Sequence, residues 1–326
     1  MNDDVRHDWT PQEVEALYAL PLTELLYRAQ TVHRRHHDPA VVQRCTLLSI
    51  KTGGCPEDCA YCPQSAWYET GVESGALMDK EDVLAAARGA RDAGSTRFCM
   101  GAAWREVRDG ASFDRVLEMV AGVAQLGMEV CTTLGMLTAD QALRLKAAGL
   151  TAYNHNLDTS ADFYPAIIGT RTYRDRLETL ARVHEAGISV CCGGIVGMGE
   201  SARDRCALLA QLGRLEPHPE SLPVNLLVRV PGTPLADAPE LDPLDLVRTV
   251  ACARLVAPGA RVRLSAGRLG LSAETQALCF LAGANSIFSG ERLLTSPNPA
   301  PDEDQRLVSR LGLRFAGADS VTSGRG

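Results

Sequence analysis

The sequence has no uninterrupted apolar stretch near the ~20 residues that a membrane-spanning helix requires, and its start, MNDDVRHDWT, lacks the apolar segment of a signal peptide. It also lacks an excess of positive charge, since 33 Lys and Arg stand against 40 Asp and Glu, for a net charge of −7. No basic field therefore exists to attract nucleic acid or an anionic membrane. We expect a cytoplasmic location and neither kind of partner.

Linkers, repeats and low-complexity tracts are missing between residues 10 and 314, so a single continuous domain is the simplest interpretation. Cysteine, in contrast, is abundant, with 11 residues. In a reducing compartment, an odd number of thiols is more typical of metal ligands, catalytic groups or core residues than of disulfides.

Short apolar runs alternate with helical patterns along the chain. The eight expected strands cover residues 46–51, 95–104, 128–135, 151–159, 188–197, 221–230, 260–268 and 284–290. Repeated strand–helix units predict an α/β protein with a parallel sheet, and the 246 residues from 45 to 290 are close to the ~250 typical of a closed (β/α)8 TIM barrel. An open, doubly wound sheet is the alternative.

The chain divides into three expected parts. Residues 1–44 form an N-terminal helical extension, in which the pattern over 10–36 predicts two helices that cap one end of the barrel. Residues 45–314 form the barrel. Residues 315–326 are small, polar or charged, which predicts a flexible tail.

Three cysteines, Cys55, Cys59 and Cys62, follow the first expected strand with the spacing C-x3-C-x2-C. Loops that follow barrel strands form the catalytic face of this fold. Three thiolates so close together suit an iron–sulfur cluster or zinc, although no second ligand pair follows, as a structural zinc site would require. A thioredoxin-like redox pair needs only two cysteines, and buried or incidental thiols are the remaining alternative.

Polar residues occupy the faces of three expected strands that should point into the barrel. Because side chains alternate along a strand, Asn154, Asn156 and Asp158 share one face, and Asn225 and Arg263 lie opposite the apolar residues of their own strands. An unpaired amide inside the barrel costs on the order of 2 kcal/mol, and an unpaired charge costs much more. We expect these residues to meet ligands; a self-satisfied polar plug is the alternative.

A family resemblance rests on the cysteine motif, with Tyr61 before its last cysteine, and on several further segments. The segments are TLLSIKTGGCPEDCAYCPQS, RFCMGAAWR, YNHNLDTS, GGIVGMGE, VRLSAGR and GANSIFSGE. The cysteine motif resembles that of the radical S-adenosylmethionine (SAM) enzymes. The whole set, from about residue 10 to 313, resembles the biotin synthase family.

The resemblance implies a sulfurtransferase that forms biotin by inserting sulfur between C6 and C9 of dethiobiotin. It implies a 4Fe-4S cluster, a 2Fe-2S cluster that gives up its sulfur, and SAM as the source of a 5'-deoxyadenosyl radical. An electron donor such as flavodoxin and a homodimer are further implications. No catalytic residue is expected beyond those that bind the cofactors and the substrate.

The resemblance also assigns site residues. Cys55, Cys59 and Cys62 would hold the 4Fe-4S cluster. The residues assigned to SAM are Tyr61, Asn154, Asn156, Asp158, Gly193, Ile195, Gly197 and Glu200. Those assigned to dethiobiotin are Asn154, Asn156 and Asn225, and the ligands assigned to the 2Fe-2S cluster are Cys99, Cys131, Cys191 and Arg263.

Arg263 is an unusual ligand, because a guanidinium stays protonated and has no free lone pair. A nearby cation that does not bind iron is the alternative role. Cys192 follows Cys191 directly and should face the opposite side of the strand. The remaining thiols are expected in the core or on the surface, namely Cys45, Cys206, Cys252 and Cys279.

Two other hypotheses stay open at this point. The first is another radical SAM enzyme of the same barrel class, and the second is a non-catalytic protein that binds zinc or acts as a scaffold. An anaerobic count of iron and sulfide separates them, because only the biotin synthase assignment requires both cluster types.

Overall fold

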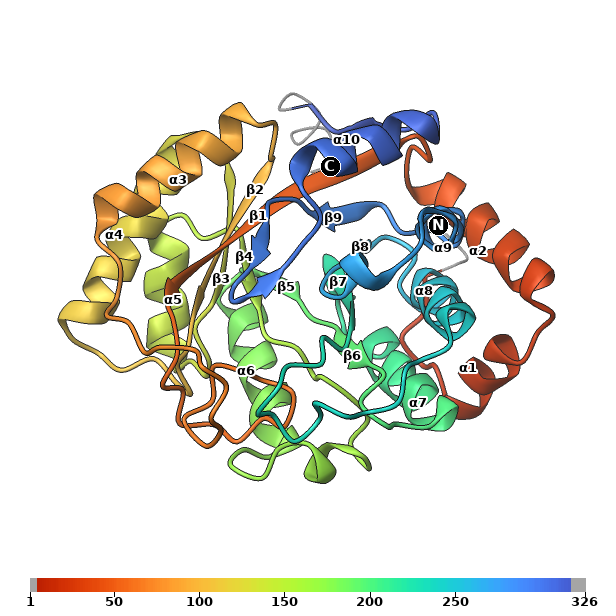
Figure 1. Ribbon diagram of the computed structural model, residues 1–326, viewed down its shortest axis with the longest axis horizontal. Coiled ribbons are helices and arrows are strands. Elements are labelled where there is room, and N and C mark those ends of the chain that lie inside the picture. The colour runs from red at the N-terminus through yellow and green to blue at the C-terminus, as the bar shows by residue number, and fades with distance from the viewer. Residues whose placement is uncertain (1–4, 318–326) are drawn as a thin grey trace.

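The computed structural model describes residues 5–317, and its centre is a closed barrel of parallel strands (Figure 1). Each strand pairs with the next in chain order, and β1 closes the barrel by pairing with β9. The barrel strands are β1 (Val41–Lys51), β2 (Arg97–Ala102), β3 (Glu129–Thr133), β4 (Ala152–Asn154), β5 (Ser189–Cys191) with β6 (Gly194–Val196), β7 (Ser221–Leu226), β8 (Arg261–Leu264) and β9 (Ser286–Phe288). The predicted (β/α)8 barrel is confirmed, and the open sheet is wrong.

Helices cover the outside of the barrel between consecutive strands. They are α3 (Lys80–Asp92), α4 (Ala111–Gln125), α5 (Ala139–Ala147), α6 (Tyr173–Glu185), α7 (Ala202–Gly213), α8 (Pro243–Val256) and α9 (Ala273–Leu281). Thr138, Thr172 and Ser201 begin three of them as N-caps, each accepting a hydrogen bond from the backbone of the third helical residue. The predicted helical patterns all coincide with these helices.

The strand predicted over 188–197 is interrupted between β5 and β6. At the break the backbone of Gly193 passes so close to β7 that a Cβ there would lie 1.9 Å from the carbonyl oxygen of Pro223. The side chain of Asn156 accepts a hydrogen bond from the Gly193 amide (3.1 Å), replacing one bond of the ladder. A glycine at this point therefore allows the strand to bend around the barrel interior.

The N-terminal helices α1 (Pro11–Tyr18) and α2 (Leu22–His36) do not cap an end of the barrel, so that expectation is wrong. They pack from outside against α7, α8 and α9, as Figure 1 shows. The reason lies in α8, whose sequence PLDLVRTVACARLV is apolar on nearly all sides. One face of α8 packs on the barrel, and α1 and α2 bury the other.

Both expected domain boundaries shift, because the sheet extends beyond them. β1 begins at Val41, before the expected boundary at residue 45, and pairs there with β12 (Arg314–Phe315). The guanidinium of Arg44 lies 3.7 Å from the centre of the Phe315 ring. Of the flexible tail expected over residues 315–326, Phe315 belongs to this strand, and residues 318–326 lie outside the described part of the chain.

The sequence reasoning did not identify α10 (Pro301–Arg310) or the small hairpin β10 (Arg292–Leu293) and β11 (Ser296–Pro297) before it. An ion pair joins α10 to the barrel: Asp304 accepts from Arg268 at 2.7 Å, and both side chains are 1% exposed. Arg268 lies in the short 3-10 helix Arg268–Gly270, and a second 3-10 helix covers Tyr164–Ala166. None of the helices within residues 5–317 is long and apolar enough to cross a bilayer.

His33 and His37, whose rings stack at the end of α2, attach this helix to α8. His33 is 2% exposed, and Arg254 of α8 lies beside His37, with 2.9 Å between the Arg254 Nη1 and His37 Nε2 atoms. Burial, and then the charge of Arg254, lower the pKa of His33 to about 3. The folded protein therefore excludes a proton that the unfolded chain, with a histidine pKa of 6.5, accepts.

We predict that the iron-free protein loses stability as the pH falls from 6.5 towards 3. Below pH 6.5 the unfolded chain binds a proton at His33 that the folded chain, with its lowered His33 pKa, does not bind, so unfolding becomes more favourable. His33 alone should contribute about 2 kcal/mol of this loss between pH 6.5 and 5. Urea unfolding at several pH values measures it. His33→Phe should flatten the dependence by that amount, whereas His184→Gln on the exposed face of α6 should not; equal slopes for all three proteins would contradict the prediction.

Candidate functional site

A cavity of about 320 Å³ lies inside the barrel, at the ends of the strands where loops lead to the helices. TIM barrels carry their active sites at this end. Six cysteines line the cavity, namely Cys55, Cys59, Cys62, Cys99, Cys131 and Cys191. The first three come from the loop after β1, and the other three come from β2, β3 and β5.

Cys55, Cys59 and Cys62 lie on a loop that folds back on itself. The amide of Cys62 donates to the carbonyl of Cys59 (2.9 Å), and the amide of Cys55 donates to the carbonyl of Gln64 (2.9 Å). Burial raises the pKa of Cys62 to about 11 and also raises that of Cys59. These thiols therefore need a metal or another positive charge to become thiolates.

The two acidic residues between the cysteines anchor this loop to the segment before α6. Glu57 is 2% exposed and pairs with Arg171 at 3.1 Å. Asp58 accepts hydrogen bonds from the amides of Gly169 and Thr170, both at 3.0 Å. The sequence analysis assigned no role to Glu57 and Asp58; two adjacent carboxylates between closely spaced cysteines were the available signal.

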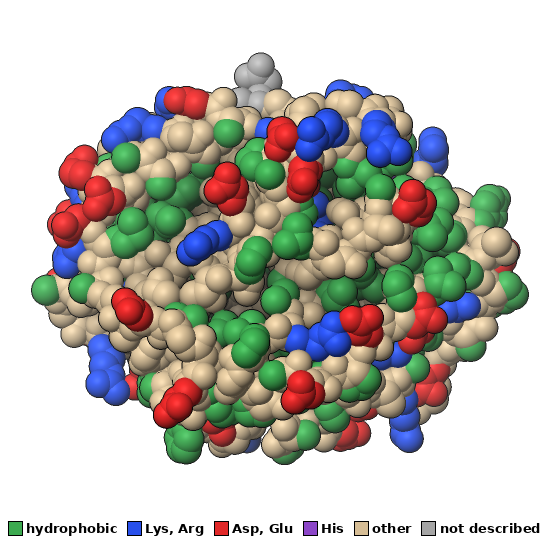
Figure 2. Space-filling model, in the orientation of Figure 1, with side chains coloured by type: hydrophobic (Ala, Val, Ile, Leu, Met, Phe, Trp, Pro, Cys, Tyr) green, Lys and Arg blue, Asp and Glu red, His purple; other side chains and the backbone are tan. Residues whose placement is uncertain are grey.

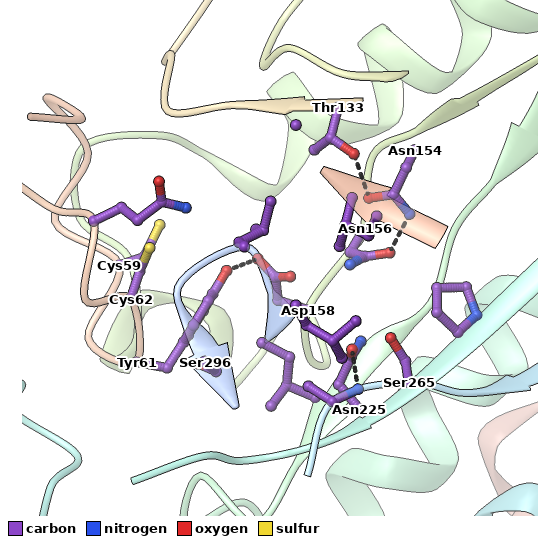
Figure 3. Close-up of a pocket in the computed structure, with 18 of the residues that line it drawn as sticks. Cys59, Tyr61, Cys62, Thr133, Asn154, Asn156, Asp158, Asn225, Ser265 and Ser296 are labelled. Carbon is purple, nitrogen blue, oxygen red and sulfur yellow. Dashed lines mark hydrogen bonds between the residues drawn. The ribbon is translucent and has the colours of Figure 1, made fainter. Parts of the chain in front are cut away.

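The carboxylate of Asp158 contacts two side chains of the protein, of which Figure 3 labels Tyr61. The hydroxyl of Tyr61 donates to its Oδ2 atom at 2.9 Å, and Arg176 lies 2.5 Å from the same atom. Arg176 also donates to the carbonyl of Asn156 at 2.7 Å. Asp158 has a left-handed φ of 67°, so the segment after β4 turns sharply here instead of continuing as the predicted strand. The carboxylate thus connects the cysteine loop, through Tyr61, to α6.

Asn154 and Asn156 form a chain of hydrogen bonds along the cavity wall (Figure 3). Thr133 donates to the Oδ1 atom of Asn154 at 3.2 Å, and the Nδ2 atom of Asn154 donates to Asn156 at 3.1 Å. Asn225 donates to the carbonyl of Gly194 at 3.0 Å. The side-chain amides satisfy part of their hydrogen bonding with neighbouring protein groups, as the polar-plug hypothesis requires. They nevertheless surround a cavity, and these hydrogen bonds fix their orientation.

The glycine-rich segment after β5 is only partly at the cavity. Ile195 lines it, whereas Gly193, Gly197 and Glu200 do not. The carboxylate of Glu200 accepts from the Gly197 amide at 2.9 Å and pairs with Arg205 at 2.9 Å. In this arrangement Glu200 closes a turn, and a direct contact of Glu200 with a cofactor stays a prediction.

Cys99, Cys131 and Cys191 meet deeper in the barrel, each at most 3% exposed. Cys99 and Cys131 are direct partners in the pairing of β2 with β3, and Cys191 is the partner of Asn154 in the pairing of β4 with β5. The Nδ2 atom of Asn154 lies 3.3 Å from the Cys191 sulfur. A hydrogen bond from the Cys131 thiol, and then the charge of Arg263, lower the pKa of Cys191. The structure brings these three thiols together, while their binding of a cluster stays a prediction.

Arg263 is fully enclosed and makes only donor contacts. It donates to the Ser286 hydroxyl at 2.9 Å and lies 3.9 Å from the sulfur of Cys191 and 3.3 Å from the sulfur of Cys45. Cys45 belongs to the same buried group as the three deep thiols. The expectation that Cys45 is an ordinary core thiol is therefore incomplete, because its place on the inward face of β1 follows only once the barrel is closed.

The other thiols behave as predicted. Cys192 is fully buried on the outer side of the barrel, in the core formed with the surrounding helices, opposite to Cys191. Cys206, Cys252 and Cys279 belong to the same outer core.

A buried ion-pair group forms the floor below the deep thiols, and the sequence reasoning missed it. Arg97 is 1% exposed and lies 2.9 Å from both Glu129 and Glu220. Gln43 donates to Glu129 at 3.1 Å. Arg97 and Glu129 each stand two residues before a deep cysteine, so strand parity was the signal that identified their inward face.

The donor chemistry of the cavity fits two iron–sulfur clusters. Thiolates are the soft ligands that bind such clusters, and the cavity presents three of them at its mouth and three more at its depth. Within residues 5–317, no group of three His, Cys, Asp or Glu side chains is placed so that it could hold a single metal ion.

Comparisons with known proteins place the sequence among characterised families. A model described as the radical SAM superfamily matches residues 49–212, and one described as the Biotin and Thiamin Synthesis associated domain matches residues 223–314. The chain is 66% identical over 313 residues to a biotin synthase of Methylococcus capsulatus, covering 96% of each chain. It is 64% identical over 309 residues to a biotin synthase of Sorangium cellulosum, covering 95% of this chain and 88% of that one.

Solved structures with the same fold are much more distant in sequence. Methylornithine synthase (PylB) superposes with a TM-score of 0.78 at 18% identity, covering 95% of both chains. The FeFe-hydrogenase maturase HydG from Carboxydothermus hydrogenoformans superposes with a TM-score of 0.78 at 16% identity, covering 95% of this chain and 76% of that one. These structures support the fold.

The opposite orientations of two adjacent cysteines give a direct test of the site. We predict that Cys191→Ser lowers the cluster content of the deep site at least about tenfold after anaerobic reconstitution, because it removes an inward ligand. Cys192→Ser should leave that content unchanged, since its side chain lies in the outer core. Visible absorption and Mössbauer spectra measure the difference, and the reverse result would show that the register of β5 is off by one residue.

Proposed function

The chain belongs to the biotin synthase family within the radical SAM superfamily, and we propose that the cavity inside its barrel brings together the residues that bind both clusters and both substrates of this family's reaction. The enzyme inserts sulfur into dethiobiotin by radical chemistry and forms biotin. The observation that carries the proposal is the pair of thiol sets, one at the mouth and one at the depth of one cavity, with oriented amides between them.

The chemistry explains why two such sets are needed. The carbon–hydrogen bonds of dethiobiotin are unactivated, so acids, bases and nucleophiles of the protein do not attack them. When bound, a 4Fe-4S cluster with SAM supplies an electron and a 5'-deoxyadenosyl radical, and a 2Fe-2S cluster supplies sulfur. The protein itself binds, orients and excludes water.

At the mouth, Cys55, Cys59 and Cys62 would hold the 4Fe-4S cluster and leave one iron free for the methionyl group of SAM. The anchors of Glu57 and Asp58 fix the position of this loop against the segment before α6. A fixed loop keeps the reactive end of SAM in one place, because a misplacement of about 1 Å can reduce a rate 100-fold.

Between the two thiol sets, Asn154, Asn156 and Asn225 would bind SAM and dethiobiotin. Their hydrogen bonds to neighbouring groups fix which end of each amide faces the cavity. Tyr61 and Ile195 also line this part and would contact SAM. Asp158, already bound by Tyr61 and Arg176, contributes by holding Tyr61 in place.

At the depth, Cys99, Cys131 and Cys191 would hold the 2Fe-2S cluster, with Arg263 beside it. The charge of Arg263 lies next to the Cys191 sulfur and stabilises negative charge on the deep thiols. Below them the ion pairs of Arg97 close the barrel floor and leave the mouth as the route of entry.

Three further parts of the proposal concern the surroundings of the enzyme. A one-electron donor such as flavodoxin would approach the cysteine loop, where Trp67 is 64% exposed. Charges of both signs alternate with apolar side chains on the face shown in Figure 2, so a donor would meet no strong field of one sign there. A homodimer and a cytoplasmic location complete the proposal; a reducing cytoplasm suits a chain whose 11 cysteines are all free.

We predict that Cys59→Ala abolishes the reductive cleavage of SAM while the barrel stays folded, because Cys59 packs in a small cluster with Tyr164 and Met198 that is separate from the two large cores of the barrel. The measurement is the yield of 5'-deoxyadenosine after anaerobic reconstitution and reduction with dithionite, with Cys206→Ala in the outer core as the control. A normal yield from Cys59→Ala would overturn the assignment of the loop. An iron and sulfide count on the wild type that fits only one cluster type would overturn the assignment of the deep thiols.

A further inference from the structure

Cys45 is a fourth thiol at the deep site, beyond the three that the proposed function uses. Its side chain is fully buried in the group that contains Cys99, Cys131 and Cys191. Its sulfur lies 3.3 Å from the Nη2 atom of Arg263 and 3.7 Å from the hydroxyl of Ser286. β1, which carries it, lies between β2 and β9, so Cys45 closes the ring of inward residues around the site.

Arg263 reaches both Cys45 and Cys191 with its two terminal nitrogens. Nη1 is 3.9 Å from the Cys191 sulfur, and Nη2 is 3.3 Å from the Cys45 sulfur. The guanidinium therefore lies against both thiols, on the side of the site opposite to the β2–β3 pair of Cys99 and Cys131. When this side chain is displaced, Cys45 is next to the space that it leaves, together with Ser286 and Gln43, and of these three it is the one that carries a thiol.

The chemistry of the two side chains differs sharply. A thiolate is an ordinary ligand of iron–sulfur clusters, which commonly take four cysteines. A guanidinium stays protonated in proteins and offers no lone pair, and all four contacts of Arg263 with polar neighbours are donor contacts. Binding of Cys45 to iron would release its thiol proton.

We propose that Cys45 is an alternative fourth ligand of the deep cluster, whose thiolate takes the coordination position beside Cys191 whenever the side chain of Arg263 does not occupy it. The inference rests on the proposed function, since it needs a cluster at the three deep thiols. It means that this barrel holds iron by four thiolates when Arg263 is withdrawn or replaced, so the site keeps its iron while the cluster is rebuilt.

The test compares four reconstituted proteins: Cys45→Ser, Arg263→Met, the double variant of both, and the wild type. Arg263→Met removes both the charge and the donor groups of the guanidinium. We expect it to retain its cluster with both irons in similar all-sulfur surroundings by Mössbauer spectroscopy. The double variant should lose cluster iron to a chelator at least roughly tenfold faster than Arg263→Met. Cys45→Ser alone should keep the cluster, because Arg263 is still present.

The controls separate this inference from the function on which it rests. A second double variant combines Arg263→Met with Cys279→Ser in the outer core. It should lose iron at the same rate as Arg263→Met alone. If Arg263→Met does not fold, as judged by circular dichroism of the iron-free protein, Arg263→Lys provides the second background. Equal iron loss and equal spectra with and without Cys45 in these backgrounds would overturn the inference and leave the function intact. A wild type without any deep cluster would overturn both.

Discussion

A cation buried without a carboxylate partner is the constraint that organises the interior of this barrel. Two of the buried guanidinium groups, those of Arg97 and Arg263, lie close to the deep thiols, and their surroundings differ. Arg97 is neutralised by Glu129 and Glu220. Within the described residues Arg263 has no acidic partner, and its neighbours are thiols, a hydroxyl and an amide. Because an uncompensated buried charge is costly, negative charge on sulfur would stabilise this interior, and the cluster proposed for the deep thiols would provide it.

Ion pairs also fix the residues at the mouth of the cavity. The cysteine loop has little regular structure, yet Glu57 and Asp58 bind it to the segment before α6, and Tyr61 reaches Asp158. Arg176 of α6 holds that carboxylate in turn. These contacts join the loop that carries the first thiol set to the strand end that carries the amides. A fixed arrangement of this kind keeps bound groups aligned.

Irregular backbone occurs where the site requires it. The left-handed turn at Asp158 and the close approach at Gly193 interrupt the neighbouring strands β4 and β5. Asn156, between them, uses its side chain to replace a missing backbone hydrogen bond. These departures leave room for a cavity where regular strands would fill the barrel with side chains. Strand irregularity here is a consequence of binding ligands inside a fold whose interior is otherwise packed.

Local pattern by itself determined the eight alternating strands and the loop cysteines, because strand–helix alternation and a motif of closely spaced residues are properties of neighbouring positions; the β1–β9 pairing decided that the sheet closes. Strand parity also identified the inward amides and distinguished Cys191 from Cys192. Only the tertiary structure decided which inward residues meet across the barrel. Cys45 and Arg263 are 218 residues apart in the chain, and they become neighbours because β1 and β9 close the sheet. The packing of α1 and α2 on α8 was decided in the same way, since an apolar face does not specify which surface will cover it.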